Sequence, residues 1–299
     1  QANVRNSGIV IDTTAVAGTD TVTVTSASNN HGNTSLNVIA GTEAGDVITI
    51  DGTTTFSGTT TLDAKTINLN ANVTNAVTGT TATSVNVASP GQIQDGIDVS
   101  ADGSTVNIAS GSYTGDVNTS AKSVTLDPAG TVASTGTWTL DNNDTLNVAI
   151  NGTTPGTQYD QIDVTGSIAL GGAILNATGT YTPTTADTFE IIKATGAVTG
   201  SLDASTYLLN SKPLTPTYDA TAPGNVVLGF DATPDLTGTG GNDEFVISRD
   251  GSGNVVVKRN GDTILTVPEG DLSSLDITPG DGDDTLVVDV SNGDPIPAG

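Results

Sequence analysis

The chain has 299 residues, of which 33 are acidic and 8 are basic, so its formal net charge is −25. The few cations are scattered singly along the chain, whereas binding to a phosphate backbone requires clustered cations. Nucleic acid and an anionic membrane surface are therefore not expected partners. The absence of Cys excludes disulfides, Cys-ligated structural zinc and a thiol nucleophile.

The sequence also lacks Met. Without an initiator residue, Gln1 is expected to follow a processing site or to begin a fragment. A removed leader fits export to the extracellular space or the bacterial cell surface. No apolar run approaches the roughly 20 residues that a membrane helix needs, so direct membrane insertion is not expected.

The composition predicts an all-β protein. Thr, Val and Ile, which favour a pleated half-buried surface, are abundant, as are Gly, Asn and Asp, which favour turns. Good helix formers such as Lys, Glu and Gln are scarce. A similar Gly, Ser and Thr bias marks disordered linkers, but here aliphatic pairs recur at regular spacing, which favours a folded chain.

Short alternating segments recur through the first half of the chain. In each, apolar residues two positions apart point to one side of a strand, and the Thr or Asn between them points to the other side. We expect one-sided strands at 22–24, 47–50, 67–69, 85–87, 106–108, 124–126 and 146–150.

Gly, Asp and Asn turns separate these segments at intervals of roughly 18 to 25 residues, which is near the length of one coil of a parallel β-solenoid. A stack of such coils buries one continuous apolar column. The competing architecture, a sandwich, has hairpin turns about every 8 to 12 residues. The spacing favours a solenoid from residue 1 to about residue 205.

Two stretches resemble known families. Residues 90–98, followed by 103–113, resemble the opening of right-handed parallel β-helix proteins of the pectin-lyase-like superfamily, in which a short helix with an Ile-Gln-Asp-like step precedes a strand and a Gly-x-Tyr turn. Residues 156–172, with 181–183 and 187–192, resemble the late part of autotransporter passenger domains and related bacterial adhesins. These resemblances imply a right-handed β-helix exported to the cell surface.

The amino-acid composition changes after about residue 205, where Pro residues interrupt the strand-like segments. Because Pro is excluded from central strand ladders, residues 206–232 are expected to form a Pro-containing connector or a set of edge strands. The predicted fold is a right-handed parallel β-helix followed by a small β-sandwich-like module. Its expected divisions are an N-terminal β-rich region or start of the solenoid at 1–89, a parallel β-helix at 90–205, the connector, and the module at 233–299, with hairpin turns at 250–254 and 260–262.

The tail holds two imperfect copies of a calcium-binding nonapeptide pattern, Gly-Gly-x-Gly-x-Asp-x-apolar-x, at 238–245 and 280–286. Gly turns expose carbonyl oxygens and Asp supplies carboxylate oxygen, which are the ligands that Ca²⁺ prefers. Such sites form between adjacent coils of tandem repeats, whereas 41 residues separate Asp243 from Asp284. Plain turn chemistry therefore competes with calcium at the candidate ligands Asp243, Asp281, Asp283 and Asp284. Similar units border repeated domains in very large bacterial surface proteins.

Catalysis finds little support in the sequence. The single His31 lies in a polar turn, which favours a solvated loop residue over a general base. Many pectin-lyase-like relatives degrade polysaccharides with convergent carboxylates, but nothing in the spacing selects a pair from the candidate acids Asp95, Asp98, Asp102, Asp141 and Asp144. We expect a protein that is not an enzyme.

Trp138 is the one Trp of the chain. As a ligand-binding residue it would be a platform on which a glycan ring stacks; as a strand residue it would cover the core.

The function expected from these features is an extracellular structural protein that self-associates as part of a surface filament, surface layer or adhesin. The first alternative is a glycan-binding adhesin or fibre, and the second is a polysaccharide-degrading β-helix enzyme. Expected partners are copies of the chain and cell-surface glycans, and Ca²⁺ is the only cofactor suggested.

Overall fold

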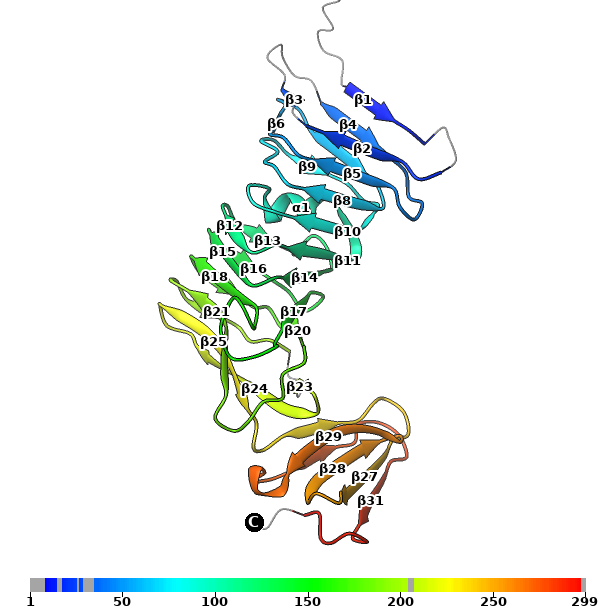
Figure 1. The fold of residues 1–299 in the computed structure, drawn as a ribbon, viewed down its shortest axis with the longest axis vertical. Coiled ribbons are helices and arrows are strands. Elements are labelled where there is room, and N and C mark those ends of the chain that lie inside the picture. Colours follow the sequence, from blue (N-terminus) through cyan, green and yellow to red (C-terminus); the bar gives the residue numbers. More distant parts are fainter. Residues whose placement is uncertain (1–8, 15–17, 26, 29–34, 204–206, 297–299) are drawn as a thin grey trace, which may run out of the picture.

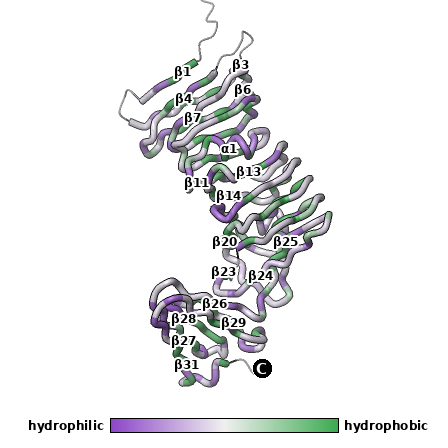
Figure 2. Tube along the Cα trace, turned by 180° about the vertical axis from the view of Figure 1, so that it is seen from behind, coloured by the Kyte–Doolittle hydropathy of each residue, from purple (hydrophilic) through white to green (hydrophobic). Residues whose placement is uncertain are grey.

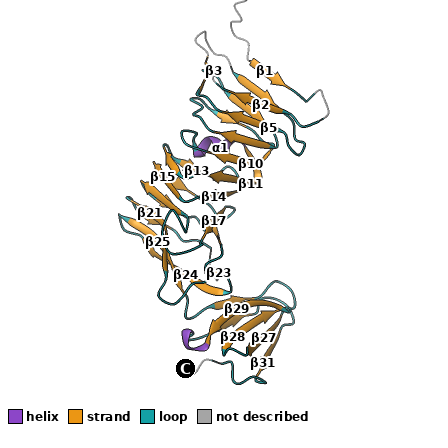
Figure 3. Ribbon diagram, viewed as in Figure 1, coloured by secondary structure: helices purple, strands orange, loops and turns teal. Residues whose placement is uncertain are grey.

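The computed structural model describes residues 9–14, 18–25, 27–28, 35–203 and 207–296. Strands and turns make up nearly all of these residues (Figure 3). The helical segments among them are α1 (Ile93–Val99) and one 3-10 turn (Glu269–Asp271). No helix within these ranges is long and apolar enough to cross a membrane. The predicted all-β class is confirmed.

The largest sheet has eight parallel strands that lie side by side in chain order. They are β2 (Thr21–Val24), β5 (Val47–Ile50), β8 (Thr66–Leu69), β10 (Ala82–Val87), β11 (Ser100–Ile108), β14 (Val124–Pro128), β17 (Thr145–Ala149) and β20 (Ile174–Thr178). All of the one-sided strands predicted from alternating residues belong to this sheet, and the prediction is confirmed.

Further parallel sheets form the other faces. Before α1 these contain β1 (Ile9–Asp12), β4 (Leu36–Ile39), β7 (Thr60–Asp63) and β9 (Val77–Thr78), with β3 (Ala27–Ser28) and β6 (Thr54–Thr55) as a separate pair. After α1, one sheet contains β12 (Gly111–Tyr113), β15 (Thr131–Thr135), β18 (Gln161–Thr165) and β21 (Thr188–Ala194), and another contains β13 (Val117–Asn118), β16 (Trp138–Thr139), β19 (Ile168–Ala169) and β22 (Val198–Thr199). We call each passage of the chain through these sheets a rung; the rungs stack along the long axis (Figure 1).

The register of the eight-stranded sheet places like residues above one another. Ile48 pairs with Ile67, and Val85 pairs with both Ile67 and Val106. Because alternate side chains of a strand point to the same face, this register builds an unbroken inward column of apolar residues, each at 0% exposure. Hydrophobic stretches accordingly follow the strands in Figure 2, and hydrophilic stretches gather at the turns.

The expected short helix of the pectin-lyase-like pattern is α1, and the strand and Gly-x-Tyr turn after it are β11 and β12. A Cβ on Gly96 would lie 2.5 Å from Cγ2 of Val87, so the helix packs directly on the sheet. The eight-stranded sheet continues past residue 90 without a break. The described parts of 1–89 and 90–205 therefore belong to one stack with one core.

The stretch expected to be a connector is folded onto the stack. β23 (Tyr207–Leu209), β24 (Lys212–Asp219) and β25 (Gly224–Phe230) are antiparallel, and β25 pairs with β21. The expected free connector is wrong, and the expected edge strands are only partly observed, because β25 lies between β21 and β24 and only β23 is the terminal strand of the sheet. Pro216 is accommodated because it lies beyond the short β23, where β24 is the sheet edge.

The tail has a separate core that begins at Leu236, after the main core ends at Leu228. β27 (Glu244–Arg249), β28 (Asn254–Arg259) and β29 (Asp262–Pro268) pair antiparallel through the two predicted hairpin turns, which are confirmed. Two parallel pairs were not expected: β31 (Thr285–Asp289) pairs with β27, and β30 (Asp276–Thr278) pairs with β26 (Asp235–Thr237). The tail thus repeats one two-strand rung, with the β28–β29 hairpin inserted between the copies.

A column of glycines occupies the turn between two sheets of the stack. The added Cβ of Gly136 would lie 2.5 Å from the Gly115 carbonyl oxygen, that of Gly166 1.9 Å from the Gly136 oxygen, and that of Gly196 2.8 Å from the Gly166 oxygen. Real Cβ atoms do not approach carbonyl oxygens so closely. Backbone therefore contacts backbone from rung to rung at this turn.

Gly166→Ala should destabilise the stack by about 1 to 3 kcal/mol, the usual cost of overpacking. Gly229→Ala is the matched control, because Gly229 lies in β25 and nothing lies within 4 Å of its added Cβ. The control should be neutral or slightly stabilising. Denaturant unfolding followed by circular dichroism measures both; equal free energies of unfolding for the two variants would contradict the column.

Candidate functional site

The outward face of the eight-stranded sheet carries a ladder of polar side chains. Asn68 Nδ2 donates to Thr49 Oγ1 (3.0 Å). Asn86 Nδ2 donates to Asn68 Oδ1 (2.7 Å), and Asn107 Nδ2 donates to Asn86 Oδ1 (2.9 Å). These residues share one register position in successive strands, and the next strand places Asp127 there. The position therefore holds a carboxylate at β14, and the ladder resumes in the next two strands, where Asn176 Nδ2 donates to Asn147 Oδ1 (2.9 Å).

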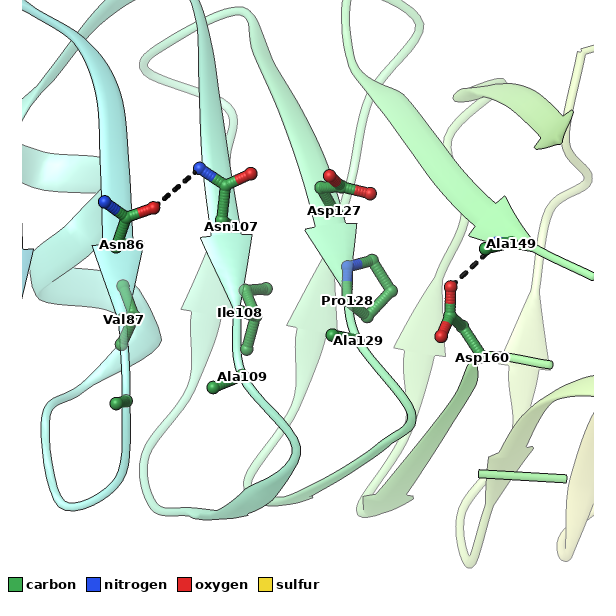
Figure 4. Close-up of a pocket in the computed structure, with 11 residues that line it drawn as sticks. Asn86, Val87, Asn107, Ile108, Ala109, Asp127, Pro128, Ala129, Ala149 and Asp160 are labelled. Atoms are coloured by element: carbon green, nitrogen blue, oxygen red, sulfur yellow. Dashed lines mark hydrogen bonds between the residues drawn. The ribbon is translucent and has the colours of Figure 1, made fainter. Parts of the chain in front are cut away.

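A hollow of about 440 Å³ lies at the carboxyl ends of β10, β11 and β14 (Figure 4). Asn86, Asn107 and Asp127 contribute polar groups to it, and no hydrogen bond within the described residues occupies the Asp127 carboxylate. Small apolar residues complete the lining: Val87, Ala88, Ile108, Ala109, Pro128, Ala129 and Ala149. Polar oxygens beside apolar surface suit a ligand with hydroxyl groups and CH faces, such as a sugar.

Asp160 closes one side of the hollow. Its Oδ1 accepts from the Gly130 N–H (2.6 Å) and its Oδ2 accepts from the Ala149 N–H (2.7 Å). Burial raises the pKa of Asp160, while the two main-chain donors act in the opposite direction. Because both oxygens already accept hydrogen bonds, this carboxylate holds the chain together at an irregular turn rather than facing a ligand.

Three further aspartates, like Asp160, join one rung to the preceding one. Each stands immediately before a strand, and its Oδ1 accepts a main-chain N–H of the rung before. The pairs are Asp46 with the Asp20 N–H (2.9 Å), Asp144 with the Val124 N–H (3.2 Å) and Asp284 with the Asp243 N–H (2.8 Å). These side chains supplement the strand ladder at the point where each strand begins.

The structure brings the two tail motifs side by side. β26 and β30 pair in parallel, as do β27 and β31, so the turn at 238–243 stacks on the turn at 279–284. The separation of 41 residues is the offset between these paired rungs, because the inserted hairpin lengthens the chain between them. The spacing that counted against a tandem calcium array in the sequence therefore does not keep the two motifs apart.

The predicted calcium ligands do not converge on one point. Asp243 Oδ2 accepts from the Thr239 N–H (2.6 Å) and Oγ1 (2.9 Å), and its Oδ1 accepts from Asn260 Nδ2 (2.7 Å). The Thr239 N–H, more than any other contact, lowers the pKa of Asp243. Asp281 and Asp283 lie exposed in the second turn.

No cluster of three or more acidic or His side chains fit to hold a metal occurs within the described ranges. The contacts of Asp243 and Asp284 are those of turn chemistry, and calcium binding stays a prediction.

Trp138 lies inside the core at 1% exposure, in β16. A ring with both faces covered by protein cannot stack on a glycan. The platform expected at Trp138 is therefore corrected, and its role as a residue that fills the core is the one observed. Its Nε1 atom is buried without a hydrogen-bond partner among the described residues.

The candidate acids are spread over separate elements. Asp95 and Asp98 lie on α1, where Asp98 accepts from Gln94 Nε2 (2.8 Å). Asp144 is 1% exposed and bonded within its turn, accepting from the Asp141 N–H (2.8 Å). Asp102 accepts from the Ser123 N–H (3.3 Å).

Asp95 is the unusual member of this set. It lines a second hollow of about 480 Å³ together with Asp116, and its Oδ2 is buried without a partner in the described chain. Burial, and then the nearby Asp98 carboxylate, raise the pKa of Asp95 to about 7. The Thr137 N–H and hydroxyl lower the pKa of Asp116.

His31 lies outside the described residues. A scan against models of protein families finds no match, and a search of curated proteins finds none either.

Sequence reasoning missed the polar ladder and the aspartates that join the rungs. The signal for the ladder was present, since Asn68, Asn86 and Asn107 each stand between two apolar strand residues. Aligning the successive strands by their apolar residues would have placed these Asn residues at one register position. The signal for the aspartates that join the rungs was weaker, because it consisted only of an Asp immediately before each strand.

The raised pKa of Asp95 predicts a pH dependence of stability. The carboxyl titrates near 3.8 in the unfolded chain and near 7 in the folded protein, so between these values folding requires proton uptake. Stability should fall as pH rises from about 4 to about 7, by a few kcal/mol at most, and stay low above that.

Asp95→Asn removes the titrating group and should therefore remove this part of the loss. The variant is expected to be more stable than the parent at about pH 8 and nearly equal to it close to pH 4. Urea unfolding at several pH values provides the measurement. Parallel pH profiles for parent and variant would contradict the assignment.

Proposed function

We propose that the chain is an extracellular structural protein without catalytic activity that self-associates as part of a surface filament, surface layer or adhesin. Its stacked rungs are proposed to form a right-handed β-solenoid. Successive parallel strands, buried inward columns and turns at each corner support this reading of the stack.

The observation that carries the proposal is that, within the described residues, both ends of the molecule are formed by terminal strands of sheets. β1 and β2 are terminal strands of their sheets at one end, and β30 and β31 are terminal strands at the other. Edge strands present unpaired N–H and C=O groups that another strand can use. Self-association is the simplest way to satisfy both edges.

The surface fits a location outside the cell. The net charge of −25 keeps separate chains apart in dilute solution, and the ordered ladder of Asn side chains gives one face a regular polar texture. The absence of Cys leaves nothing to mispair in an oxidising compartment.

Sedimentation velocity over a concentration series, with electron microscopy of the same samples, tests self-association. We expect elongated assemblies that grow with protein concentration. Each sample is compared with and without a calcium chelator, which separates metal-dependent from metal-independent assembly. A chain that remains monomeric at the highest concentration, with and without calcium, would refute the proposal.

A second candidate function is glycan binding, which the hollow beside Asp127 favours. Glycan-array binding should fall at least about tenfold on Asp127→Ala, since a hydrogen bond to a charged group contributes about 1.5 to 3 kcal/mol. Asp262→Ala, at an exposed position in the tail, is the charge-matched control. Equal binding by both variants would dismiss the hollow as a glycan site.

Release of reducing or unsaturated sugar ends from uronate polymers in the same panel would point to an enzyme instead.

A further inference from the structure

The two ends of the molecule are built alike. At one end β1 and β2 are consecutive strands of the chain, and at the other end β30 and β31 are consecutive strands. All four are terminal strands of parallel pairs. The two ends lie at opposite limits of the long axis (Figure 1).

Apolar side chains at the tail end lack the cover that their counterparts have. Phe245 and Ile247, in the preceding rung, are 1% and 5% exposed. Leu286 and Val288 pair with them in register but are 57% and 42% exposed. A small hollow of about 140 Å³ also opens beside Leu286. The last rung therefore presents an uncovered continuation of the tail core.

The same hydrogen-bonded junction occurs near both ends. In the tail, the Asp243 N–H donates to Asp284 Oδ1 (2.8 Å), and the Asp243 carbonyl accepts from the Thr285 N–H (2.8 Å). Near the head, the Asp20 N–H donates to Asp46 Oδ1 (2.9 Å), and the Asp20 carbonyl accepts from the Val47 N–H (2.9 Å).

The first rung also shares a sequence pattern with the tail rungs. Segments 12–24, 235–247 and 276–288 each begin with Asp and have Thr two, Gly six and Asp eight positions later, with apolar residues ten and twelve positions later. The local structure differs at the start, because Asp12 caps a turn through Thr14 whereas Asp235 and Asp276 begin strands. The second half, from Gly to the strand, is the part that forms the junction.

In this pattern the carboxylate of the Asp in the later rung accepts a hydrogen bond from the main-chain N–H of the matching Asp in the earlier rung. Asp284 receives that of Asp243. Asp20 has no earlier rung within the described chain, and no hydrogen bond to its carboxylate occurs among the described residues. The Asp284 carboxylate is bonded, but no rung follows β31 in its sheet. One end offers an acceptor, and the other end offers the matching edge.

We propose that β31 of one copy pairs in parallel with β2 of a second copy, in the register that sets Asp284 beside the second copy's Asp20. This inference rests on the proposed self-association and names its interface. The Asp284 N–H donates to Asp20 Oδ1 of the second copy, and the Asp284 carbonyl accepts from its Thr21 N–H. Leu286 then stands opposite Val22. The product is a head-to-tail polymer.

Charge makes this junction sensitive to salt. Each copy carries −25, and the junction places two aspartates close together, so copies repel one another at low ionic strength. The Debye length falls to about 10 Å at 0.1 M salt and to about 3 Å at 1 M. Sodium chloride alone should therefore promote polymerisation, without a divalent cation.

Cross-linking tests the register directly, because the chain has no Cys of its own. Paired residues of neighbouring strands lie at the Cα separation that a disulfide needs. A mixture of a Val22→Cys variant and a Leu286→Cys variant should form a disulfide-linked dimer on mild oxidation in high salt. Neither variant alone should do so, because in a head-to-tail polymer each Cys faces an unchanged residue.

Side-chain variants test the energetics by sedimentation of the full-length protein. Leu286→Asp should abolish polymers at concentrations where the parent assembles. Ile174→Asp is the matched control, since Ile174 is also an exposed apolar residue (45%) but lies in β20, away from both ends. Asp20→Ala should weaken association at least about tenfold through loss of a charge-assisted hydrogen bond, whereas Asp20→Asn keeps an acceptor oxygen and should assemble.

The outcomes separate the junction from the proposed function. Cross-linking only in the mixture, together with loss of polymers in Leu286→Asp but not in Ile174→Asp, supports the junction. A parent that assembles while the mixture cross-links no more than the single variants overturns the junction and leaves self-association through another surface. A parent that stays monomeric at every salt concentration overturns both.

Discussion

Parallel backbone pairing between successive rungs is the constraint on which the rest of the molecule depends. A strand of only four or five residues cannot bury its own apolar side, so each rung takes its hydrogen bonds and its core contacts from its neighbours. Register then decides side-chain chemistry. Apolar residues meet apolar residues inside, as with Ile48 and Ile67, and Asn meets Asn outside, as with Asn86 and Asn107.

An aspartate beside glycines is compatible with two roles that are easily confused in a sequence. A carboxylate next to glycines is a typical ligand in a calcium-binding turn. It is equally a group that accepts main-chain N–H hydrogen bonds where a rung begins. Asp46 and Asp144 do the second in the stack, far from the tail motif. The contacts of Asp243 and Asp284 follow the same plan, which explains their place in the sequence without a metal.

The sequence predicted best where period-two alternation extends over several residues. It identified seven of the eight strands of the large sheet, all except β20, since strands such as β5 and β17 alternate cleanly. It also identified both tail hairpins from their Gly and Asn turns. It missed short strands of the other faces such as β13 and β16, because these have only two residues each, too few for a pattern. The pairing of the two tail motifs was hidden by the inserted hairpin. The burial of Trp138 and of Asp95 depends on neighbours supplied by other rungs, which no local pattern records.

The strand direction of the sheet reverses at β25. β25 runs antiparallel to β21, so the parallel stack ends there and the tail core of eight buried residues is not a continuation of it. Two hydrophobic cores result, one long and one small, with Leu208 and Phe230 packed against the small one. The small one carries an exposed terminal strand. On heating, the tail unit is expected to melt first, so an assembly that depends on β31 would come apart into intact rods before the rods themselves unfold.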